Sequence, residues 1–243
     1  MPRAPLILAF DTSTETAVVA VGRGSRPLAI RHEPAPRAYD EGLVPRIVEA
    51  LEDAQVRAEE LDVVACGCGP GSFTGLRIAL ATAKGYAFAL GLPLVLIPST
   101  GAMAAAVRGC RSVVAVLDAK RGQIFAQAFD LRDWRTRPAA APRETARVIL
   151  DAGELASWTA AQRLVRPRAV IGAAAPPGGL ADPVRAPFLP VRFPPGPELL
   201  ALARRAFLAG RVASLDEAEP EYIRPPPFNR PADRPRGAKG SRG

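Results

Sequence analysis

Two short polar turns carry side chains that could bind a phosphorylated ligand. Each turn follows an apolar segment ending in an aspartate, Asp11 in the first half of the chain and Asp118 in the second. Thr12 and Ser13 in one turn and Lys120 in the other would then flank phosphate groups, and Asp11 would hold a cation through water. The alternative is that both aspartates only cap their own turns through hydrogen bonds to the backbone.

A glycine-rich stretch, residues 67–77, is a second candidate for anion binding. Its sequence, GCGPGSFTGLR, lies between an apolar segment and an expected helix, where backbone N–H groups can surround an anion. It is not a Walker A loop, because no Lys-Ser/Thr pair follows the last glycine, and Ser72 breaks the spacing of a dinucleotide-binding loop. The alternative is a tight turn whose glycines let a helix and a strand pack closely.

The residues needed for catalysis or for metal binding are scarce. The 243 residues include one histidine, His32, which sits among charged residues and is typical of an exposed surface. Cys66, Cys68 and Cys110 lack the paired spacing of a structural zinc site. The sequence therefore predicts no catalytic residue and no metal site. Sparse cysteines and the lack of a signal-peptide pattern favour a cytoplasmic location.

The positive charge is concentrated at the C-terminal end. The whole chain carries a formal net charge of +8, and residues 224–243 hold six basic side chains against the single acid Asp233. This segment is rich in Pro and Gly, so we expect residues 225–243 to form a disordered basic tail. A tRNA-binding arm is the alternative. No apolar run has the length of a membrane span.

Hydrophobic periodicity predicts the elements that would position these residues. A helix starting near Gly42 places Leu43, Ile47 and Leu51 at helical spacing. A second helix is expected from about residue 74 to 90, and Gly91 and Pro93 end it. The other expected helices are 100–107 and 198–210, and the expected strands are 6–10, 17–21, 28–31, 61–65, 94–97, 113–117, 124–129 and 170–171.

The pattern of strand, aspartate, turn and strand occurs twice, at Asp11 and again at Asp118. A repeat near the middle of the chain predicts two lobes, each opening with a hairpin. We therefore expect an N-terminal lobe over residues 1–98. A C-terminal lobe over residues 99–224 would include the closing helix.

The helix expected over 74–90 is apolar nearly all round. One stripe, which contains Leu76 and Leu80, can pack on a sheet, and Lys84 interrupts the remaining surface. Such a helix must be covered on both sides. Cover for the second side would come from its own lobe or from a partner protein. This second surface consists of Ile78, Ala81, Thr82, Gly85, Tyr86 and Ala89, and Arg77 lies beside Lys84 where the apolar surface is interrupted.

Several motifs resemble those of the TsaB (YeaZ) family. They are LAFDTSTE at 8–15, GPGSFTGLR at 69–77, AKG at 83–85, DAKRG at 118–122 and PEYIR at 220–224. The resemblance implies an α/β fold of the actin-like, sugar-kinase and Hsp70 type (ASKHA) with two duplicated lobes. It also implies a role in forming threonylcarbamoyladenosine beside the anticodon of tRNAs that read codons beginning with A.

The same resemblance implies partners. The chain would be the non-catalytic partner of TsaD in a heterodimer joined by the ATPase TsaE, would reach tRNA through the complex, and would form a homodimer without TsaD. No cofactor would be bound tightly, although ATP or ADP would lie at the subunit boundary. TsaD-like subunits hold a metal through a His-x-x-x-His pair, which a chain with one histidine cannot supply.

In this family the dimer contacts run through the first two helices. Relatives often carry a histidine before the first helix, where this chain has Tyr39-Asp40-Glu41. Carried onto this chain, the family contacts predict partner binding by Leu43, Ile47, Leu51, Arg77, Ile78, Ala81, Thr82, Gly85, Tyr86 and Ala89.

The rival hypothesis is an ATPase or kinase of the same fold that acts alone.

Overall fold

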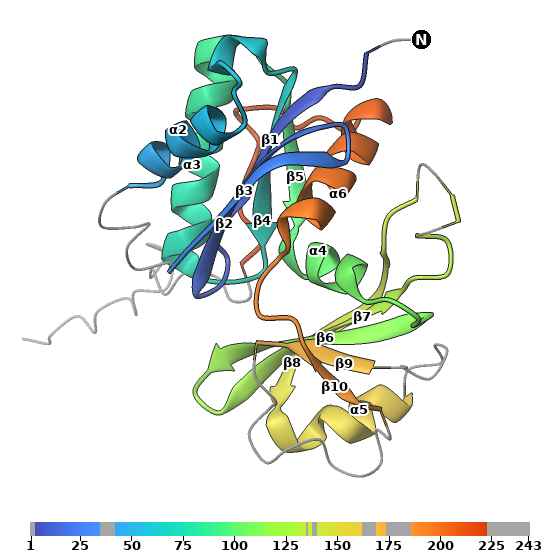
Figure 1. Cartoon of the computed structure of the whole chain (residues 1–243). Coiled ribbons are helices and arrows are strands. Elements are labelled where there is room, and N and C mark those ends of the chain that lie inside the picture. The colour runs from blue at the N-terminus through green and yellow to red at the C-terminus, as the bar shows by residue number, and fades with distance from the viewer. Residues whose placement is uncertain are drawn as a thin grey trace, which may run out of the picture.

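Two five-stranded sheets, each with its own helices, build the molecule (Figure 1). The computed structural model describes residues 3–34, 42–134, 136–137, 140–161, 169–173 and 186–222. The expected basic tail at 225–243 and the Tyr39-Asp40-Glu41 segment lie outside the described residues.

The first sheet has the strand order β3-β2-β1-β4-β5. β2 pairs antiparallel with β1 and with β3, whereas β4 pairs parallel with β1 and with β5. Both faces of the central strand are buried, because its residues are apolar at every position up to Asp11. The strands are β1 (Leu6–Asp11), β2 (Thr16–Arg23), β3 (Arg26–Pro34), β4 (Val63–Gly69) and β5 (Leu94–Pro98).

The second sheet repeats the first. Read from its other edge, its order is β8-β7-β6-β9-β10, with antiparallel pairs among the first three strands and parallel pairs among the rest. The predicted duplication of a strand-turn-strand unit is therefore confirmed. The strands are β6 (Ser112–Lys120), β7 (Gln123–Asp130), β8 (Arg143–Asp151), β9 (Ala169–Gly172) and β10 (Phe188–Pro190).

Helices cover both faces of the first sheet. α2 (Leu43–Asp53) and α3 (Phe73–Leu90) pack over one face, where Leu8 and Phe10 point toward them. α6 (Gly196–Leu208) covers the opposite face. α4 (Ser99–Ala106) lies between the sheets, because some of its side chains join the core of the first sheet and others join that of the second (Figure 1).

α6 packs on the first sheet, although it falls in the part of the chain expected as the C-terminal lobe, residues 99–224. The closing helix contacts every strand of the first sheet. Leu199 and Leu200 are fully buried there against Ile7 and its neighbours. The physical reason is that β1 has apolar residues on both faces, and α2 and α3 cover only one of them.

The second lobe holds the elements that periodicity did not predict. β8, β10 and α5 (Leu155–Ala161) fall in Pro- and Ala-rich sequence, where no clear alternation marks a strand. Two short 3-10 helices also occur, at Ala58–Glu60 and Ala152–Glu154. Within the described part of the chain, no helix has both the length and the apolar character needed to cross a membrane.

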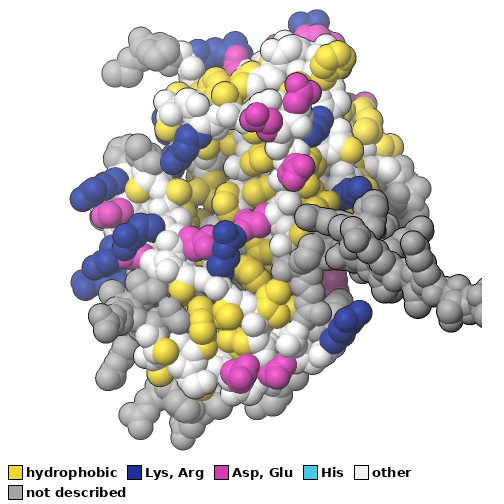
Figure 2. All heavy atoms as spheres, turned by 180° about the vertical axis from the view of Figure 1, so that it is seen from behind, with side chains coloured by type: hydrophobic (Ala, Val, Ile, Leu, Met, Phe, Trp, Pro, Cys, Tyr) yellow, Lys and Arg dark blue, Asp and Glu magenta, His cyan; other side chains and the backbone are white. Residues whose placement is uncertain are grey.

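Seen from behind, the molecule has a mixed surface (Figure 2). Hydrophobic patches on this face are separated by acidic and basic side chains, and basic side chains gather along the left edge. The charged groups break this face into small apolar areas.

Candidate functional site

Local signals at both ends define α3. The Ser72 side chain accepts a hydrogen bond from the N–H of Gly75 (3.2 Å) and so caps the first turn. Gly91 ends the helix in the left-handed conformation with φ of 64°, and the N–H of Leu92 donates to the carbonyl of Ala87. The 18-residue helix is therefore capped at both ends, and its predicted end at Gly91 is confirmed.

Only one flank of α3 is covered. Leu76, Ala83 and the rest of the first stripe are buried against the sheet. Ala81, Gly85 and Ala89 on the second flank are exposed. Within the described part of the chain, the first lobe therefore leaves this second flank uncovered. Exposed Arg77 borders this flank, and Ile78, Thr82 and Tyr86 are partly buried.

Phe88, which the sequence analysis did not single out, has the most exposed large hydrophobic side chain in the described part of the chain. Its exposure is 81%. At about 100° per residue it falls between Arg77 and Ala81 on the helix surface. Its place next to the small residues was the signal that could have identified it.

On α2 the residues predicted to bind a partner are buried. Leu43, Ile47 and Leu51 are buried in the core of the first lobe and form no exposed surface. Val44 and Val48 are the exposed apolar residues of this helix, at 47% and 43%. Helical spacing revealed an apolar stripe, but the more hydrophobic stripe packs on the lobe's own sheet.

We call the uncovered surface of these two helices the docking face. The helices lie next to each other over the same face of the sheet (Figure 1). A Cβ atom added to Gly85 would meet nothing within 4 Å, so the backbone of α3 is open to close approach by another helix. The docking face comprises Val44, Val48, Arg77, Ala81, Gly85, Phe88 and Ala89.

The Asp11 turn is closed by internal hydrogen bonds. Asp11 Oδ1 accepts from the N–H of Ser13 (2.7 Å) and from Ser13 Oγ (2.6 Å), and Oδ2 accepts from Ser99 Oγ (2.6 Å). Thr12 Oγ1 donates to the carbonyl of Gly75 (2.6 Å). Burial raises the pKa of Asp11, and the bonds from Ser13 and Ser99 act in the opposite direction.

The glycine-rich loop packs around this turn. A Cβ atom on Gly67 would lie 1.7 Å from Asp11 Oδ2, and one on Gly71 would lie 2.3 Å from the carbonyl oxygen of Ser13. The N–H of Gly69 also donates to Ser99 Oγ (3.1 Å). The geometry supports the alternative that the glycines allow close packing.

The structure does not bring the two polar turns into equivalent environments. Asp11, Thr12 and Ser13 are buried, whereas Asp118 is exposed. Lys120 ends β6, and its side chain lies outside the described part of the structure. Nucleotide binding by these residues stays a prediction.

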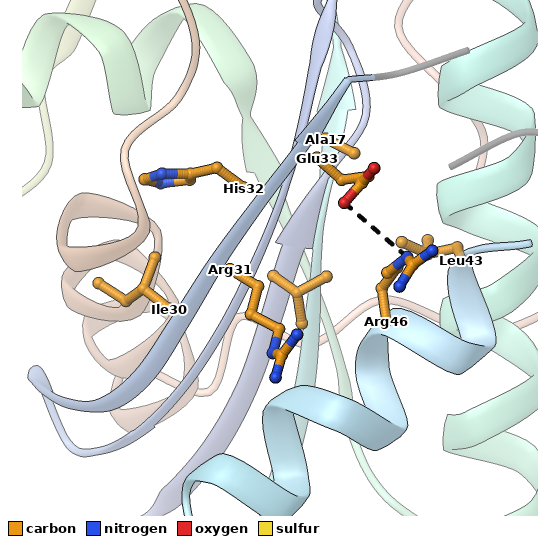
Figure 3. A pocket seen from close by; sticks show the side chains of 8 residues that line it. Ala17, Ile30, Arg31, His32, Glu33, Leu43 and Arg46 are labelled. Atoms are coloured by element: carbon orange, nitrogen blue, oxygen red, sulfur yellow. Dashed lines mark ion pairs between the residues drawn. The ribbon is translucent and has the colours of Figure 1, made fainter. Parts of the chain in front are cut away.

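A pocket of about 270 Å³ lies between β3 and α2 (Figure 3). Arg31 projects from β3 toward α2, and Arg46 projects from α2 toward Glu33 of β3. His32 projects to the other side of β3 and lies against Phe193 (4.9 Å between ring centroids). Arg31 and Arg46 both bind Glu49 of α2, at 2.7 and 2.8 Å. Arg31 of β3 attaches α2 to the sheet through Glu49 and also through Asp53 (2.7 Å), whereas the Arg46–Glu49 pair lies within α2 at i,i+3 spacing.

Comparisons with known proteins agree on the fold. A family model described as TsaD, tRNA N6-adenosine threonylcarbamoyltransferase, matches residues 30–150. The solved structure of YeaZ from Pseudomonas aeruginosa has a TM-score of 0.71 at 26% identity and covers 90% of this chain and 100% of that one. Together with the repeated sheets, this establishes an ASKHA-type fold of two duplicated lobes.

Curated relatives match about half of the chain. An uncharacterized protein of Mycobacterium leprae is 38% identical over 124 residues, which are 49% of this chain and 34% of the relative. The tRNA threonylcarbamoyladenosine biosynthesis protein TsaB of Haemophilus influenzae is 36% identical over 122 residues, 49% of this chain and 51% of the relative. The matched part thus spans about half or less of these relatives. The curated TsaB relatives and the YeaZ structure support assignment of this chain to the TsaB (YeaZ) family.

Proposed function

We propose that this chain acts in the biosynthesis of threonylcarbamoyladenosine in tRNA, as a non-catalytic subunit that binds TsaD through the docking face. The relatives named for this pathway support the pathway. The observation that carries the docking step is the uncovered flank of α3 in an otherwise well-packed lobe.

Burial of apolar surface would drive this association. Val44, Val48 and Phe88 are large apolar side chains exposed to water, and covering them gains free energy. The small side chains between them would let a partner helix approach the α3 backbone closely. An apolar centre bordered by charged residues is the usual composition of a protein interface.

TsaE as a third component, access to tRNA through the assembly, and ATP or ADP at the subunit boundary follow from the resemblance and belong to this proposal. So does homodimer formation when TsaD is absent. The docking face would then be shared between the two modes of association.

Substitution of the docking face tests the proposal. Ala81→Arg and Gly85→Arg place a long charged side chain in the middle of the face, and we expect each to abolish co-purification with TsaD. Leu208→Arg is the matched control, since Leu208 is also exposed (60%) but lies on α6, across the sheet. Circular dichroism and sizing should show that all three variants fold. Normal pairing of the two docking-face variants would refute this interface.

The rival hypothesis is an ATPase or kinase that acts alone, and the two-lobed fold is the observation in its favour. Calorimetry of the isolated chain with ATP and magnesium separates the two. Our proposal expects neither tight binding nor turnover. Turnover that is lost in Asp11→Asn, in a variant that still folds, would favour the enzyme.

A further inference from the structure

The last described residues attach to the start of α3. The N–H of Glu221 donates to the carbonyl of Cys68 (2.6 Å), and its carboxylate forms an ion pair with Arg147 of β8 in the second lobe. The Tyr222 ring lies 4.9 Å from the ring of Phe73, the first residue of α3. Glu221 and Tyr222 therefore connect β8 of the second lobe to the N-terminal end of α3 in the first lobe.

Arg77 continues this stack onto the docking face. Its guanidinium carbon lies 4.9 Å from the centroid of the Phe73 ring, a cation–π geometry. Tyr222, Phe73 and Arg77 thus form a continuous series of stacked groups. Stacking restricts the rotamers of a long side chain, so less entropy is lost when the guanidinium binds a second group.

Arg77 carries an exposed positive charge at the border of the docking face. The side chain is exposed, and no carboxylate among the described residues forms an ion pair with it. The first turn of α3 contains no acidic residue. An exposed cation held in a fixed orientation beside an apolar surface is complementary to an anion at the edge of a partner's interface.

We propose that the Tyr222–Phe73–Arg77 stack makes Arg77 the charge-selecting contact of the docking face, and that the partner helix carries an Asp or Glu carboxylate opposite it. This inference rests on the proposed docking with TsaD. Burial of the apolar groups supplies affinity, and the Arg77 contact selects the partner and its register. Tyr222 acts as a positioning residue through Phe73.

The test measures the affinity of the full chain for TsaD by calorimetry at low and high salt. We expect Arg77→Glu to weaken binding at least about tenfold and Arg77→Lys to weaken it less, because lysine keeps the charge but loses the planar contact. Wild-type affinity should fall with salt more steeply than that of Arg77→Gln. A charge-reversing substitution of one interface carboxylate on TsaD should restore binding to Arg77→Glu, which a merely structural role would not explain.

The positioning role has its own variants. Tyr222→Leu removes the stacked ring and should weaken binding severalfold, whereas Tyr222→Phe keeps the ring and should bind as the wild type does. Melting temperatures of the free chains check that each variant is folded. Equal affinities for Tyr222→Leu, Tyr222→Phe and wild type would overturn the role of Tyr222.

The outcomes separate this inference from the docking proposal. If Gly85→Arg abolishes binding while Arg77→Glu binds normally, the docking face stands and the charge-selecting role of Arg77 is refuted. If neither variant affects binding, the docking proposal itself fails. If Arg77→Glu leaves TsaD binding intact but weakens tRNA binding by the assembled complex, the anion is a phosphate and the proposed carboxylate is wrong.

Discussion

Asp11 is a buried carboxylate whose hydrogen bonds join three parts of the first lobe. Its partners lie in its own turn and at Ser99, the first residue of α4, and Ser99 in turn binds Gly69 of the glycine-rich loop. Three donated hydrogen bonds offset the cost of burying the carboxylate. The residue thus holds together the same turn and loop that the sequence suggested for anion binding.

Asp11→Ala should destabilise the chain by about 3 kcal/mol, because it leaves the buried donors of Ser13 and Ser99 without an acceptor. Urea unfolding monitored by circular dichroism measures this loss. Thr14→Ala is a matched control in the same turn, since the Thr14 side chain makes only a local bond with Thr16. A loss no larger than that of the control would contradict the structural role.

Asp130 is the residue for which the dependence of folding stability on pH has the clearest expected sign. Hydrogen bonds from Arg132, and further from Arg143, lower the pKa of its carboxyl to about 2 from 3.8. The ionised form is favoured on folding, so its stabilisation is present above the unfolded pKa and is lost as the pH falls toward 2.

Both arginines are half exposed or more, so solvent screens the effect, and we expect a loss of about 1 kcal/mol. Urea titrations between pH 5 and pH 2.5 should show a smaller decrease for Asp130→Asn than for the wild type. Identical decreases would show that the ion pairs contribute nothing.

At the scale of elements, α3 has clear capping residues at both ends, but a glycine within it lowers the stability of the isolated helix. Gly85 lies within the helix, where glycine costs roughly 0.5–1 kcal/mol relative to alanine. Nothing in the lobe requires this glycine, because an added Cβ meets no atom within 4 Å. Close approach by a partner helix would explain a glycine at this position.

Gly85→Ala should therefore have opposite effects on folding and on binding. We expect the free chain to gain about 0.5–1 kcal/mol in the free energy of unfolding, since alanine loses less backbone entropy. Binding to TsaD should weaken, because the new methyl group separates the helices. Gly153→Ala, which also has open space around it, is a control that should leave TsaD binding unchanged. Unchanged binding by Gly85→Ala would contradict close packing at this residue.

At the scale of the whole molecule, one arginine connects the two lobes. Arg205 of α6 lies over the Trp134 ring, 4.0 Å from its centroid, and donates hydrogen bonds to the carbonyls of Trp134 (2.7 Å) and Ala140. Trp134 Nε1 donates in turn to the carbonyl of Ala105 (3.1 Å). The segment after β7 is thereby held against helices that pack on the first sheet.

Arg205→Ala should cost about 2 kcal/mol, from the lost cation–π contact and from carbonyl groups left without a donor. Hydrogen exchange should rise in residues 131–134 while β1 stays protected. Arg204→Ala, its neighbour on α6, is the control, because none of the hydrogen bonds and ion pairs of the described residues runs to its side chain. Equal hydrogen exchange in Arg205→Ala and Arg204→Ala would refute the role of Arg205 in holding residues 131–134.

The sequence by itself determined the local elements of the first lobe, the repeated hairpin and the apolar character of α3 nearly all round, because turn residues and hydrophobic periods act over a few neighbouring positions. Only the tertiary structure decided which stripe of α2 faces the sheet, which lobe receives α6, and that the Asp11 turn points inward. Those choices depend on which apolar surfaces and hydrogen-bond donors from distant segments are available to pair, and spacing along the chain does not encode them.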